Sequence, residues 1–141
     1  MDETFILMCR EAKEIQDQWK PKDGDYVTYW QEFANKRVPS AFEYLQKDYD
    51  GVIIDDIGHP IKNCGNVVWL PRQEDLQKIY FQHFNLHDEM VVLYHFKQWE
   101  NSLKAIIQKL FPTITITWLS FVMGTCYNKQ WNGETGKWEV I

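Results

Sequence analysis

The strongest constraint on the fold is a stripe of large apolar residues that recurs at steps of four and three over residues 92–110. This spacing places every member of the stripe on one face of an α-helix. Asp88 is a residue type that caps helix N-termini, and Pro112 cannot continue a helix. The sequence therefore predicts a helix over 89–110 whose apolar face is made by Val92, Phe96, Trp99, Leu103, Ile106 and Leu110.

Two further helices are predicted before this one. Residues 3–19 mix apolar and polar positions at helical spacing, without a breaker before Pro21 and Gly24. Residues 71–84 open with a proline, whose fixed φ suits the first helical position, and carry two acids in the first turn. The inward residues of this second helix are expected to be Leu76, Ile79, Tyr80 and Phe84 (or Phe81).

Residues 40–48 could form a short helix, and a further helix is predicted over 114–128. Ser40 is a suitable cap for the first, with Phe42, Tyr44 and Leu45 inward. Thr113 can cap the second, although the alternation of Thr and Ile over 113–117 also fits a strand. The buried side of the second helix would contain Trp118, Leu119, Val122, Met123 and Cys126.

Four segments have the character of strands. Residues 52–57 and 67–70 are short, rich in β-branched residues and separated by turn formers, which predicts antiparallel neighbours. Residues 25–30 are rich in strand formers, although their aromatic residues also recur at a helical period; a strand is favoured. Two tryptophans flank a glycine-containing turn over 131–138, which predicts a terminal hairpin.

The order of these elements indicates an α+β fold, with about four helices packed on a small antiparallel sheet and a C-terminal hairpin. The chain has 141 residues, of which 45% are hydrophobic and 16% aromatic, so one aromatic-rich core is feasible. No repeat, linker or low-complexity tract divides the sequence. We expect a single globular domain over 1–141.

Composition limits the functional classes. The net charge of −5 disfavours nucleic-acid binding, which needs a basic surface. The three cysteines are far apart, as in a protein with reduced thiols and neither disulfides nor a zinc site. The N-terminus lacks the basic start and long apolar run of a signal peptide, and no segment approaches the ~20 apolar residues of a membrane span. The expected location is the cytoplasm, with no membrane association and no cofactor.

Two clusters could carry chemistry. Asp55, Asp56 and His59, near Cys64, combine carboxylates with an imidazole, which suits divalent metal binding or acid–base catalysis, although a polar turn has the same composition. His83 and His87 have the i, i+4 spacing of zinc ligands, but Asn85 predicts a helix break between them. His95 is expected at the edge of the core or on the surface. No metal site is predicted with these residues.

Two binding candidates follow from charge and aromatic character. Arg72, beside Gln73 at a predicted helix start, could grip an anionic partner, or could pair with a nearby acid. Trp131 and Trp138, near two lysines, could form a stacking platform for single-stranded nucleic acid, which the acidic composition disfavours.

Two groups of short motifs carry a resemblance. One comprises Gly24-Asp25-Tyr26-Val27, Trp69-Leu70-Pro71-Arg72-Gln73 and Leu76-Gln77; the other comprises Trp118 to Met123, Tyr127-Asn128-Lys129, Trp131-Asn132-Gly133 and Trp138. The chain resembles short proteins encoded by phages and prophages of Gram-positive bacteria, mainly over residues 65–138. The resemblance carries over no catalytic residue. It implies a small accessory role in the cytoplasm of a bacterial host.

The leading functional hypothesis is therefore a non-enzymatic phage accessory protein that acts as a protein-binding module, toward another protein or toward a second copy of itself. The alternative is a small metal-assisted hydrolase or nuclease that uses Asp55, Asp56 and His59. A weaker alternative is single-strand binding through the C-terminal tryptophans.

Overall fold

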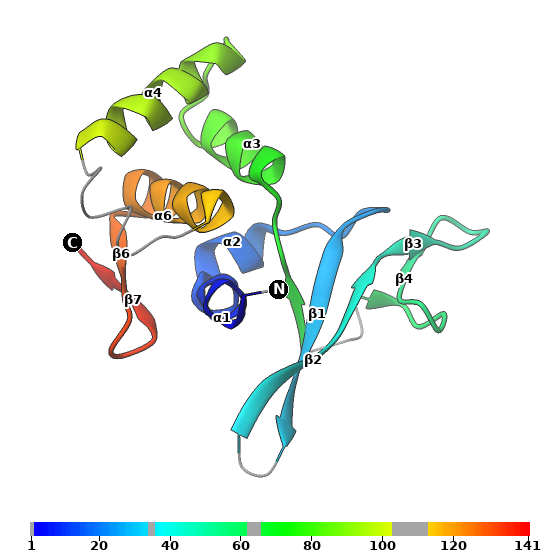
Figure 1. Cartoon of the computed structure of the whole chain (residues 1–141). Helices are drawn as coiled ribbons and strands as arrows, with labels where there is room; N and C mark the ends of the chain where they lie inside the picture. Colours follow the sequence, from blue (N-terminus) through cyan, green and yellow to red (C-terminus); the bar gives the residue numbers. More distant parts are fainter. Residues whose placement is uncertain (1, 34–35, 62–65, 103–112) are drawn as a thin grey trace. The chain divides into compact units, whose positions relative to one another are not determined.

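Helices and antiparallel strands make up the computed structural model, which describes residues 2–33, 36–61, 66–102 and 113–141 (Figure 1). The α+β class and the C-terminal hairpin predicted from the sequence are confirmed. The chain divides into two compact units, Met1–Pro71 and Arg72–Ile141. The expectation of a single domain over 1–141 stays a prediction.

The first unit begins with two short helices, α1 (Glu3–Glu11) and α2 (Lys13–Gln18). The continuous helix predicted over 3–19 is wrong at Ala12, where ψ is 73° and the side chain is fully buried. Ala12 still donates its backbone N–H to the carbonyls of Met8 and Cys9, but the chain then turns. No breaker in the sequence marks this bend, because alanine is the best helix former.

A three-stranded antiparallel sheet of order β2-β1-β5 forms the rest of the unit's framework. Its strands are β1 (Tyr26–Phe33), β2 (Lys36–Tyr44) and β5 (Val67–Trp69). The strand favoured over 25–30 is confirmed by β1. Beyond β2, the strands β3 (Gln46–Lys47) and β4 (Ile53–Ile54) pair as a small ribbon (Figure 1).

Two predictions in this region are wrong. Residues 40–48 form the end of β2 and β3 instead of a helix, because β2 pairs with β1 along most of its length. Residues 52–57 and 67–70 are not neighbours, since β4 pairs with β3 while β5 pairs with β1. For residues 40–48, pairing with β1 overrides the local helical propensity. For residues 52–57, the strand is present as β4 but its partner is β3, the strand just before it in the chain.

Gln16 joins the helices to the sheet. Its side-chain oxygen accepts the backbone N–H of Trp69 at 3.0 Å, and its side-chain nitrogen donates to the Trp69 carbonyl at 2.9 Å. The same nitrogen donates to the carbonyl of Cys9 at 3.1 Å. The side-chain amide of Gln16 therefore forms hydrogen bonds with the outward N–H and carbonyl of Trp69 in β5 and with a carbonyl at the end of α1. The indole of Trp19 stacks on that of Trp69, with ring centroids 5.7 Å apart.

The second unit contains three described helices and the hairpin: α3 (Gln73–His83), α4 (Glu89–Ser102), α6 (Ile114–Tyr127), β6 (Lys129–Asn132) and β7 (Lys137–Val140). The N-cap of α3 is Arg72, so the predicted start at Pro71 is two residues early. The predicted helix over 89–110 is confirmed to Ser102, and residues 103–110 lie outside the described part of the chain.

The core of the second unit is aromatic. Trp118, which is 1% exposed, stacks on Phe96 with ring centroids 3.9 Å apart and planes inclined by 7°. Phe121 meets both rings edge to face and stacks on Tyr80. This cluster ties α3 and α4 to α6. Most of the predicted inward residues that the structure describes are buried, but Trp99 and Cys126 are half-buried and Phe84 is exposed. Leu103, Ile106 and Leu110 lie outside the described residues.

The ends of α6 follow the sequence signals. The Thr113 hydroxyl accepts the backbone N–H of Ile116 at 3.2 Å, which confirms the predicted cap and excludes a strand at this position. Asn128 ends the helix in the left-handed conformation, with φ of 56°, and β6 starts at the next residue. None of the helices in the described ranges combines the length and the apolar character that crossing a membrane requires.

Candidate functional site

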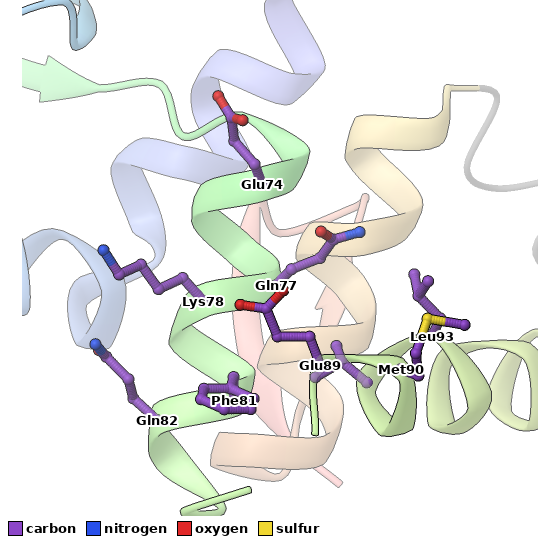
Figure 2. A pocket seen from close by; sticks show the side chains of 9 residues that line it. Glu74, Gln77, Lys78, Phe81, Gln82, Glu89, Met90 and Leu93 are labelled. Carbon is purple, nitrogen blue, oxygen red and sulfur yellow. The ribbon is translucent and has the colours of Figure 1, made fainter. Parts of the chain in front are cut away.

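A groove runs between α3 and α4 and has a volume of about 490 Å³ (Figure 2). Glutamate, glutamine and lysine side chains border it, and four apolar side chains provide its hydrophobic surface. In Figure 2, Met90 and Leu93 project from the same side of α4, whereas Lys78 and Gln82 leave α3 on the side opposite Gln77. The lining residues are Glu74, Gln77, Lys78, Phe81, Gln82, Glu89, Met90, Val92 and Leu93.

Most of this lining is open to solvent. Six of the nine residues are exposed, and Val92 is the buried one. Met90 is 67% exposed and Leu93 40%, although both are large and apolar. Sites for small molecules enclose most of the ligand surface and converge polar groups on it. This groove is instead suited to a partner that adds its own apolar surface from outside.

Sequence reasoning did not identify this groove. The apolar stripe led to the buried face of α4, and Val92 and Phe96 are buried as expected. Met90, Leu93 and Tyr94 occupy other faces of the same helix and are exposed. These additional apolar residues were the signal in the sequence that could have indicated a second contact surface. A helix that packs on a single face usually carries polar residues on its other faces.

The two histidines with zinc-like spacing are separated by the end of α3, as predicted. His83 is in the last turn, Asn85 adopts a positive φ of 49°, and His87 lies beyond the helix. The ring of His83 packs edge-on against Phe84. His95 is half-buried at the core edge, where Nδ1 lies 2.8 Å from the Tyr80 hydroxyl oxygen.

The cluster around Asp55 is organised as a turn. One Asp55 oxygen accepts the backbone N–H groups of Ile57 at 3.0 Å and His59 at 2.8 Å. The other oxygen lies 3.5 Å from Nδ1 of His59, an exposed imidazole. Asp55 is buried, whereas Asp56 is exposed and donates its backbone N–H to Glu43 at 3.3 Å. The structure therefore brings Asp55 and His59 into contact, whereas Asp56 contacts Glu43 instead.

Within the described ranges, no group of three or more histidine, cysteine, aspartate or glutamate residues is placed to hold a metal ion. Cys64, the fourth member of the predicted cluster, lies outside those ranges. Asp55 already accepts two backbone hydrogen bonds, which are the bonds expected of an aspartate that stabilises a turn. The hydrolase alternative stays a prediction.

Glu43 is a buried acid that the sequence did not single out. It is 8% exposed, and its side chain accepts a hydrogen bond from the Tyr29 hydroxyl group and lies beside Asp56. Burial raises the pKa of Glu43 above its ordinary value near 4.5, and the neighbouring Asp56 carboxyl raises it further, while the Tyr29 hydrogen bond opposes both. Folding therefore favours the protonated form of this acid.

This raised pKa predicts a pH-dependent loss of stability. Protonated Glu43 stabilises the fold below the unfolded-state pKa, and that stabilisation is lost as the pH rises through the higher folded-state pKa. Glu43→Gln should therefore gain stability relative to the wild type as the pH rises above about 4.5. Thermal melts of both proteins from acid to neutral pH measure the difference. A difference that is independent of pH would contradict the assignment.

Tyr29→Phe provides a matched variant. Loss of the hydroxyl removes the contact that lowers the pKa of Glu43, so the stability loss should extend to higher pH than in the wild type. The two variants therefore change the pH profile in opposite ways.

The remaining candidates make local contacts. Nε of Arg72 lies 3.6 Å from a carboxylate oxygen of Glu74 and of Asp75, in agreement with the local-pairing interpretation, and Gln73 is the half-buried first residue of α3. Trp131 and Trp138 are half-buried and face each other across the hairpin, with ring centroids 5.3 Å apart. Arg72 and the two tryptophans therefore make local contacts, and the binding predictions for these four residues stay untested.

The two described cysteines are free thiols. Cys9 is fully buried, and burial raises its pKa well above 9.0. Burial also raises the pKa of the half-buried Cys126 to about 12, although its hydrogen bond with Thr125 acts in the opposite direction. Since the thiolate is the nucleophile, neither thiol is activated for catalysis at neutral pH.

Comparison of the chain with protein-family models, with curated proteins and with solved structures finds no match.

Proposed function

We propose that the chain is a non-enzymatic protein-binding module, an accessory protein of a phage or prophage that acts in the cytoplasm of a bacterial host. The groove between α3 and α4 receives an α-helix of the partner. The observation that carries this proposal is the exposure of Met90 and Leu93 on a groove with an apolar surface and a polar rim. Amphipathic helices dock in such grooves through apolar side chains three and four residues apart.

The polar rim supports a protein partner over a small molecule. Glu74 and Glu89 lie at the starts of α3 and α4, and Lys78 borders the same groove. A polar rim around an apolar centre is the usual organisation of a protein interface. The resemblance to small phage-encoded proteins supports the same accessory role.

The test is a tagged pull-down from a Gram-positive host lysate, read by mass spectrometry, with wild type and two variants. Met90→Lys places a charge in the groove and should remove the captured protein. Ile57→Lys is the matched control, because Ile57 is 73% exposed on a turn of the first unit, and it should retain capture. Equal capture by both variants would exclude the groove as the binding site for the captured protein. A photo-reactive residue at Met90 that cross-links no protein would refute the function.

A further inference from the structure

We infer that the partner helix is α4 of a second copy of this chain, packed antiparallel on the first across a two-fold axis at Leu93. This inference rests on the proposed function, because Glu89, Met90 and Leu93, which line the groove, also belong to the face of α4 that pairs. Charged and apolar residues are regularly spaced along the exposed side of α4.

Positions 89, 93 and 97 are four residues apart and therefore follow one another along a single face of the helix. They are occupied by an acid, an apolar residue and a base: Glu89, Leu93 and Lys97. Met90 and Tyr94 border this face and are 67% and 61% exposed. The face is thus apolar at its centre and oppositely charged at its two ends.

An antiparallel two-fold pairing makes this face complementary to itself. With the axis at Leu93, position 89 of one copy meets position 97 of the other, so Glu89 and Lys97 pair twice. Leu93 packs on its own counterpart, and Met90 of each copy approaches Tyr94 of the other. In the isolated chain Lys97 contacts Glu100 at 3.3 Å, an exposed pair that exchanges easily for the new one.

The size of the interface sets the expected strength. A helix of 14 residues is about 21 Å long, so a pair of such helices gives an interface at the low end for specific complexes. We expect a dimer that dissociates in the micromolar range. Sedimentation from about 1 to about 300 µM covers the concentrations where an interface of this size is half-formed.

Charge reversal provides the decisive test. Glu89→Lys and Lys97→Glu should each be monomeric alone, because each places like charges opposite one another twice. Mixing the two variants should restore dimers, because every pair then joins a base with an acid. Leu93→Asp should be monomeric in all mixtures, and Lys47→Glu, an exposed change in the first unit, should dimerise as the wild type does.

A wild type that stays monomeric over the whole range, or a dimer that survives Leu93→Asp, overturns the inference. Failure to recover dimers from the mixed charge variants also overturns it. If the wild type is monomeric while Met90 still cross-links another protein, the proposed function stands and only this partner is refuted. If neither occurs, both are refuted.

Discussion

Replacing Gln16 with alanine is expected to lower the free energy of unfolding by about 2–4 kcal/mol, because it leaves buried backbone groups without partners. The side-chain amide of Gln16 bonds to both the N–H and the carbonyl of Trp69, and Trp69 is only 5% exposed. Its third bond, to the carbonyl of Cys9, holds the bend between α1 and α2. Urea denaturation followed by circular dichroism measures the loss.

Gln18→Ala is the matched control for this change. Gln18 is on the same helix, is exposed, and donates to the Glu14 carbonyl. Surface substitutions of this kind change stability by at most about 0.5 kcal/mol. If Gln16→Ala were no more destabilising than Gln18→Ala, the hydrogen bonds of Gln16 would contribute little to the fold.

Trp118→Ala should have the largest effect in the second unit, about 3–5 kcal/mol, which is typical of a large buried ring replaced by a methyl group. The substitution removes the stack on Phe96 and the edge contact with Phe121, and so loosens α4 from α6. Denaturation midpoints and the m-value together show whether stability or compactness has changed.

Trp118→Phe separates ring packing from hydrogen bonding. The indole N–H of Trp118 has no acceptor among the described residues, so phenylalanine gives up no hydrogen bond and keeps a ring against Phe96. We expect a loss of about 1–2 kcal/mol, which reflects the smaller ring. A loss as large as that of the alanine variant would mean that the stack is not the main contribution.

Local signals predicted the second unit well. The cap at Thr113, the break at Asn85 and the tryptophan hairpin each depend on residues within a few positions of one another. These elements could be read from the sequence because each follows from a cap, a turn or a helical period.

The first unit was predicted less well, because its elements depend on long-range pairing. Glu43 and Leu45 are buried while Tyr44 is exposed, which is the alternation of a strand, yet the segment 40–48 has helix-forming character in isolation. Only its pairing with β1 decides between the two. The candidate groove was missed for a related reason, since it exists only once α3 and α4 pack together.

Each outer strand of the first unit's sheet has a position that offers no free backbone N–H to a further strand. On β5, the amide of Gln16 occupies the outward N–H and carbonyl of Trp69. On β2, Pro39 lies opposite Trp30. The N–H of Trp30 points away from β2, toward the Asn66 carbonyl, so the backbone nitrogen of Pro39 points away from β1, toward the open edge. Because proline has no N–H, this position offers no hydrogen-bond donor at that edge. Edge-to-edge growth into fibres is thereby discouraged at both borders of the sheet.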